Sequence, residues 1–285
     1  MFEFISLGVA ILFASLNSVL LHNIDFSKKG LVIRFNIIGS CIWALILFVL
    51  GGRPEVNKSV LIYGTLYALA QVLFLIFKAK AMSLGPVSLT TLIGNMSLIL
   101  STVCGVLIWN EKVSPMQILG IILLIISIVI CTYEKNSEKN NAAWIFCCVL
   151  FFIFAAAVGI IFKFFSKTGE NINNMMFFAS LMMIVLLFPF SFLCKEKEKN
   201  NSQYTPTYII KLVICGIISC LYNRINIYLS GAMDSIIFFP SFNGSVIILS
   251  TLFGVVLFKE KLKPKQIAGI TLGLISILSI GIFKA

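Results

Sequence analysis

Long apolar runs return along the whole chain and constrain its fold more than any other feature of the sequence. Ten runs of about 20 apolar residues can be counted, and each is long enough to cross a hydrocarbon layer of roughly 30 Å as a helix. They lie near residues 3–22, 30–50, 59–80, 85–108, 114–133, 143–165, 173–194, 207–230, 235–258 and 264–283. The runs are continuous rather than alternating, and a backbone in lipid must satisfy its own hydrogen bonds. The sequence therefore predicts an all-α membrane protein with ten transmembrane helices rather than a β-barrel.

The charged residues are few and lie mainly between these runs. Only 12% of the 285 residues are charged and 59% are hydrophobic, which is too little charge to cover a water-facing domain. The net charge of +11 comes from short clusters of Lys and Arg at the ends of runs, the arrangement of membrane-flanking loops. We therefore expect a lipid bilayer as the surroundings and no nucleic acid as a partner.

Residues that could hold a metal or perform catalysis are scarce. The eight cysteines form no CxxC pair and fall within or beside apolar runs, and His22 is the only histidine. Neither a GxSxG, an HExxH nor a Walker-type glycine loop occurs in the sequence. We expect no cofactor, no metal and no enzymatic activity.

An internal repeat divides the chain. The segment LSTVCGVLIWNEKVSPMQILGI (100–121) aligns without gaps with LSTLFGVVLFKEKLKPKQIAGI (249–270), and the match includes polar residues that apolar composition alone would not align. We predict a first five-helix repeat over 1–133, a polar linker over 134–142 and a second five-helix repeat over 143–285. Because five is odd, the second repeat must enter the membrane from the opposite side. Inverted repeats are a common architecture of transporters, whose solute site lies between the halves.

Two signature segments carry a family resemblance. The motif A-M-x-x-G-P-V-S (81–88) followed by W-N-E-K-V-S-P-M-Q-I-L-G (109–120), with its second copy F-K-E-K-L-K-P-K-Q-I-A-G (258–269), resembles the ten-helix EamA-type members of the drug/metabolite transporter superfamily. The resemblance covers essentially the whole chain. It implies a multi-pass transporter of the plasma (inner) membrane, present as a monomer or homodimer, and it leaves the solute open.

The paired Glu-Lys-x-x-Pro segments also have a reading of their own. Glu111 and Glu260 are predicted to end one helix, and Pro115 and Pro264 to begin the next, where a missing N–H does no harm. A structural role is favoured for the glutamates, with a catalytic or proton-carrying role as the alternative. In the last run, Gly269 and Gly273 form a GxxxG pattern, for which packing inside the chain is favoured over a dimer contact.

Polar residues within the spans are the candidates for a solute site, because each is costly in lipid unless it meets a partner or a water-filled cavity. In the eighth span, small and polar residues recur at steps of three and four and predict one cavity-lining face: Gly216, Ser219, Asn223, Asn226 and Ser230. Arg224 lies beside this face. Its guanidinium is suited to a carboxylate or phosphate, and snorkelling to the interface or an internal partner is the other possibility.

Asn95 and Asn243 occupy similar places in the two halves. Gly94, Pro240 and Gly244 weaken the helix around them, so a break there would free backbone groups for a polar solute. The alternative is that the two asparagines form hydrogen bonds between helices. The substrate-binding candidates are Asn17, Asn36, Tyr67, Gln71, Asn95, Asn223, Arg224, Asn226 and Asn243. Four lysines near span ends are predicted to be interface anchors: Lys78, Lys80, Lys163 and Lys211.

These features give two functional hypotheses. The first is a secondary transporter that moves a small polar metabolite, such as an amino acid or other carboxylate, by alternating access. The second is an exporter of multiple drugs or quaternary cations. Small four-helix relatives that expel cations carry a glutamate within the first helix, whereas this chain has Asn17 there and no acidic residue deep in any span. The sequence therefore favours the first hypothesis.

Overall fold

The computed structural model describes residues 2–21, 29–85, 87–132, 142–193, 206–258 and 264–282, and every regular element within these ranges is a helix. The first half contains α1 (Phe2–Leu20), α2 (Lys29–Gly51), α3 (Lys58–Leu84), α4 (Val87–Asn95), α5 (Ser97–Trp109) and α6 (Pro115–Thr132). The second half contains α7 (Ala142–Ser166), α8 (Ile172–Leu193), α9 (Pro206–Ala232), α10 (Ser235–Phe258) and α11 (Pro264–Ile282). His22, Glu260 and all of the predicted linker before Ala142 lie outside the described residues.

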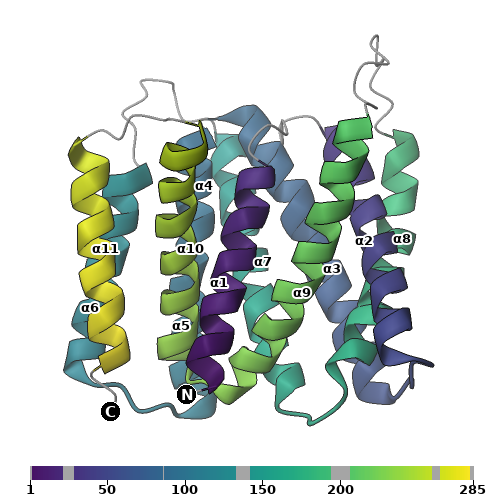
Figure 1. The fold of residues 1–285 in the computed structure, drawn as a ribbon, viewed down its shortest axis with the longest axis horizontal. Helices are drawn as coiled ribbons and strands as arrows, with labels where there is room; N and C mark the ends of the chain where they lie inside the picture. Colours follow the sequence, from purple (N-terminus) through teal and green to yellow (C-terminus); the bar gives the residue numbers. More distant parts are fainter. Residues whose placement is uncertain are drawn as a thin grey trace.

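The helices stand side by side and roughly upright, and α1 begins on the same face of the molecule where α11 ends (Figure 1). We call this the terminal face. Among the described residues, seven helices are long and apolar enough to cross a membrane on their own, and three shorter apolar stretches, Ile93–Trp109, Pro115–Ile130 and Ile267–Ile280, supply the other crossings. With α4 and α5 counted as one crossing, the ten predicted spans are all present, and the predicted fold class is confirmed.

The helix packing has the symmetry of two inverted repeats. Helix α1 of the first half packs against α9 and α10 of the second half. Its counterpart α7 in the second half packs against α3, α4 and α5 of the first half. Likewise α2 packs against α9 as α8 packs against α3. The pairs α2–α8, α5–α10 and α6–α11 each join a helix to its own counterpart. Exchanging the two halves therefore reproduces most of these contacts, although α7 packs against α9 more closely than α1 packs against α3. Five crossings per half give the copies opposite directions.

The contact between α6 and α11 depends on small residues. The Ser127 hydroxyl of α6 donates a hydrogen bond to the Gly269 carbonyl of α11 at 2.7 Å. A Cβ atom at Gly273 would lie 2.6 Å from Ser127 Oγ and 2.8 Å from Ile248 Cδ1, which is too close for either contact. The GxxxG pattern thus faces the interior of the chain, as the sequence predicted.

The helix break predicted in both halves is found in only one. In the first half α4 ends at Asn95 and α5 begins at Ser97, so the crossing is interrupted where expected. In the second half α10 continues through Pro240, and the predicted break near Asn243 is wrong. A proline removes only one N–H from the helix, and Pro240 lies near the start of α10, which begins at Ser235.

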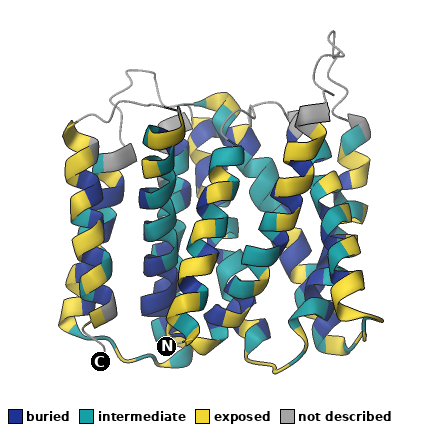
Figure 2. Ribbon diagram, in the orientation of Figure 1, coloured by how far each residue is buried: buried dark blue, intermediate teal, exposed yellow. Residues whose placement is uncertain are grey.

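The outward surface is apolar. Figure 2 shows exposed positions along the outer faces of the helices, and they include large side chains such as Leu107, Val185 and Val256, with exposed fractions of 72%, 62% and 73%. Apolar patches of this extent are rare on proteins surrounded by water. Together with the lengths of the helices, the surface identifies a multi-pass integral membrane protein.

Replacing Gly273 tests the close approach of α6, α10 and α11. We expect Gly273→Leu to lower the thermal unfolding temperature of the detergent-solubilised protein, because overpacking a tight contact costs about 1–3 kcal/mol. Gly8→Leu is the matched control, since Gly8 is exposed on α1 and a Cβ there would meet nothing within 4 Å. Equal unfolding temperatures for the two variants would contradict this packing.

Candidate functional site: a cavity between the two halves

A cavity of about 480 Å³ lies between the halves, within the range of small-molecule sites. Among the described residues, every helix except α6 and α11 contributes to its lining. The first helix of each half does so with the same spacing. The residues with matching spacing are Ala14, Asn17, Ser18 and Leu21 from α1 and the residue that follows its end, and Ala155, Val158, Gly159 and Phe162 from α7, which also contributes Phe151. The cavity is therefore built around the symmetry of the repeat.

Eight of the nine predicted site residues line this one cavity: Asn17, Asn36, Tyr67, Gln71, Asn95, Asn223, Asn226 and Asn243. Of the face predicted on the eighth span, Gly216, Ser219, Asn223 and Asn226 line it, and Ser230 is buried outside it. Arg224 is the exception. It is exposed on α9 and does not line the cavity, because one residue along a helix turns the side chain by about 100°. The prediction that its guanidinium faces a solute does not fit this placement.

Three amide groups of the lining bond within their own helices. The Nδ2 atoms of Asn36, Asn223 and Asn243 donate to the carbonyls four residues earlier, at 2.7, 2.8 and 2.9 Å. Asn243 thus bonds along its own helix rather than to a neighbouring one. The Oδ1 atoms of Asn17 and Asn226 are buried and have no hydrogen-bond partner among the described residues. These two acceptors come from opposite halves.

Aromatic rings form much of the wall and join the halves across it. Tyr67 of α3 stacks on Phe162 of α7 with ring centroids 5.1 Å apart and planes inclined by 22°. The Trp43 indole N–H of α2 donates to Ser219 Oγ of α9 at 2.8 Å. These contacts give the cavity apolar faces between its amide groups.

One basic side chain lies among the lining residues. Lys78 lines the cavity, with Nζ 5.6 Å from the centroid of the Phe74 ring, and no described lining residue is acidic. The prediction that Lys78 is only an interface anchor rested on its nearness to the end of the span and missed this placement. Gln71 and Lys78 are seven residues apart, two helical turns, and this spacing was the available signal that they share a face.

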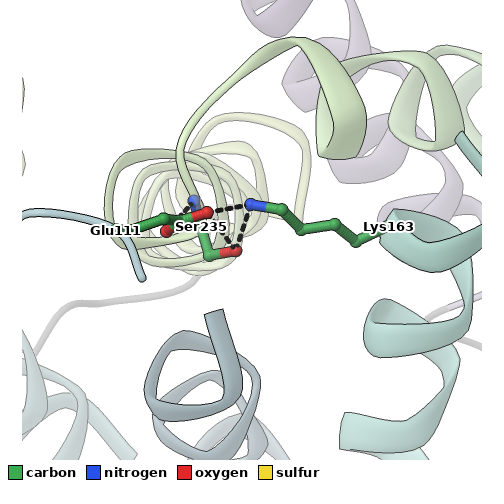
Figure 3. Close-up of polar contacts among 3 residues, drawn as sticks. All are labelled: Glu111, Lys163 and Ser235. Atoms are coloured by element: carbon green, nitrogen blue, oxygen red, sulfur yellow. Dashed lines mark hydrogen bonds and ion pairs between the residues drawn. The ribbon is translucent and has the colours of Figure 1, made fainter. Parts of the chain in front are cut away.

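Lys163 corrects another prediction. Instead of reaching to the interface, its side chain is 2% exposed and forms an ion pair with Glu111. Its Nζ atom also donates to the Ser235 hydroxyl at 2.6 Å (Figure 3). Lys80 and Lys211 are exposed, as interface anchors should be. Sequence position alone could not separate these cases, because the partner of Lys163 lies 52 residues earlier in the chain.

A cavity between two inverted helical halves is a common arrangement in transporters. The family model named "Sugar transport protein" matches residues 36–285. The chain belongs to this family and is a membrane transporter of small solutes.

Comparisons with curated proteins and with solved structures gave different results. A comparison of the sequence with curated proteins found no match. Among solved structures, one described as a crystal structure of a protein superposes on 99% of this chain and 98% of its own, with a TM-score of 0.74 and 14% sequence identity. At that identity the likeness supports the fold alone.

A substitution at Asn226 tests whether this buried amide is needed for folding. We expect Asn226→Leu to leave the unfolding temperature unchanged or to raise it, because a buried acceptor without a partner costs about 1–3 kcal/mol. Asn57→Leu is the comparison outside the cavity, since it removes a donor that bonds to Glu170 at 2.6 Å, and it should lower the temperature slightly. A large drop for Asn226→Leu would mean that this amide holds the fold together.

Proposed function

We propose that this chain moves a small, uncharged, polyhydroxylated solute of the sugar class across the plasma (inner) membrane by alternating access, as a ten-helix member of the drug/metabolite transporter superfamily. The observation that carries the proposal is the lining of the cavity. Amide side chains alternate there with aromatic faces, and the described lining residues include no acid. A sugar offers hydroxyl groups to amides and apolar C–H faces to aromatic rings, so the two surfaces are complementary in chemistry.

The family description supports the same class of solute, since the matching model is that of a sugar transport protein. Arg224 had suggested a carboxylate, and its place outside the cavity removes that reason. The symmetry of the two halves supports alternating access. A cavity between two inverted halves can be exposed to each side in turn when one half rocks against the other.

The lining weighs against the alternative of a drug or cation exporter. An acidic partner would favour an organic cation in a cavity of low dielectric, and the described lining includes Lys78 and no acidic residue.

A panel of solutes tests this proposal. We expect neutral hexoses and pentoses to raise the thermal unfolding temperature of the purified protein, because a ligand bound only to the folded state stabilises it by mass action. Quaternary ammonium compounds should have no effect. Uptake of the same sugars into reconstituted vesicles should follow the ranking of the thermal shifts.

A blocked cavity supplies the control for this panel. Gly39 lines the cavity and a Cβ there would meet nothing within 4 Å, so Gly39→Leu should fill space without disturbing the fold and should abolish both the shift and the uptake. Gly8→Leu outside the cavity should keep both. A shift with cations and none with sugars would replace the proposal with the exporter hypothesis.

Lys78 favours one second candidate, a carboxylate-bearing metabolite such as an amino acid. For that solute Lys78→Gln should weaken uptake by about tenfold or more, since a charge-assisted hydrogen bond in the cavity is lost. Arg224→Gln removes a basic side chain from the exposed side of α9, outside the cavity, and should leave uptake unchanged. Equal effects of the two substitutions would exclude a direct contact between Lys78 and the solute.

A further inference from the structure

A buried polar cluster lies between the cavity and the terminal face. Its members are Glu111, which follows α5, Lys163 in the last turn of α7 and Ser235, the first residue of α10. Glu111 belongs to the first half and its two partners to the second, as Figure 3 shows. The side chains of Lys163 and Glu111 are 2% and 8% exposed, and Ser235 is fully buried.

Every side-chain polar atom of this cluster has a partner. The Lys163 ammonium contacts Glu111 Oε1 and donates to Ser235 Oγ at 2.6 Å. The Ser235 backbone N–H donates to Glu111 Oε2 at 2.7 Å, and its hydroxyl donates to Glu111 Oε1 at 3.2 Å. The carboxylate thus meets both a lysine and the positive end of the α10 helix.

Apolar packing encloses the cluster. Lys163 Nζ lies 5.0 Å from the centre of the Trp109 ring, and that ring packs against Phe164 with centroids 4.8 Å apart. A Cβ at Gly105 would lie 2.2 Å from the Cβ of Ser235, so only glycine allows α5 to come this close to α10. The first half is therefore held tightly to the second at this point.

The cluster lies directly beneath the cavity. Phe162, Phe238 and Phe239 are lining residues within about one turn of helix ends on the terminal face. Lys163 follows Phe162 in the chain, and Ser235 precedes Phe238 by three residues. A solute leaving the cavity between α5, α7 and α10 would have to pass through these buried side chains.

We propose that the Glu111–Lys163–Ser235 cluster is a gate, closed in this structure, that keeps the two halves together on the terminal face and separates once in every transport cycle. This inference rests on alternating access as the proposed function. The ion pair suits a gate because it is satisfied only when the halves meet, and because water entering an opened interface can solvate both charges. The sequence counterpart of Glu111 in the second half, Glu260, lies outside the described residues.

Sided labelling of a cavity cysteine tests the gate. Val158 lines the cavity, and Val158→Cys would be placed in the full chain after its eight native cysteines are replaced by serine or alanine. Vesicles of both orientations, identified by an epitope at the C-terminus, are treated with a membrane-impermeant maleimide. We expect Glu111→Gln and Lys163→Met to raise the labelling rate from the terminal face by about tenfold, a typical size for a conformational coupling, and to lower it from the opposite face.

Two more variants sharpen the result. Ser235→Ala removes only the hydroxyl and should produce a smaller shift in the same direction, and it carries the test if a charge variant does not fold. Glu170→Gln is the matched control. Glu170 accepts a hydrogen bond from Asn57 across the halves on the same face, outside the cavity lining, and its substitution should leave labelling unchanged.

The outcomes separate the gate from the proposed function. One outcome is that sugars shift the labelling of Val158→Cys from one face to the other in protein with the native cluster, and that the cluster variants show the same labelling as that protein. This result would support alternating access and refute the gate. A fall in unfolding temperature without a change in sidedness likewise makes the cluster purely structural. If labelling stays on one face in every variant and sugars neither bind nor enter vesicles, the proposed function fails and the gate fails with it.

Discussion

The absence of water in the bilayer core is the constraint on which the rest of this structure depends. Every backbone N–H and C=O in lipid must be satisfied by the chain itself, and this requirement turns each apolar run into a helix. The same constraint sorts the side chains. Large apolar residues lie at exposed positions on the outer faces of the helices, where Figure 2 shows the exposed positions. Polar residues of the spans line the cavity between the halves, and several of them form hydrogen bonds within their own helices.

The number of crossings and the repeat could be predicted from the sequence because both depend on local pattern, the length of apolar runs and the match of two segments. The polar residues of the site could be found for a related reason, since an asparagine such as Asn226 is conspicuous among apolar neighbours. The direction in which a side chain points from its helix is harder to predict. Arg224 and Asn223 are adjacent in sequence, yet one is exposed and the other lines the cavity. The partners of Lys163 come from other helices, so no local pattern distinguishes it from the exposed lysines.

The cavity and the buried cluster beneath it both contain polar side chains, but these side chains differ in whether they have hydrogen-bond partners. Beside the cavity, the amide oxygens of Asn17 and Asn226 are buried and have no hydrogen-bond partner among the described residues. In the cluster, Glu111 and Lys163 bond to each other and to Ser235 until every polar atom is satisfied. Side chains that are all hydrogen-bonded to one another offer no free donor or acceptor to a solute.

The odd number of crossings in each half has a consequence beyond orientation. Two copies with five crossings each can be joined end to end by a short connection, because the first copy finishes on the side where the second must start. A duplicated gene could therefore produce this architecture in one step, with no extra segment to bring the chain back across the membrane. By the same reasoning, two separate chains of half this length, inserted in opposite directions, could enclose an equivalent space.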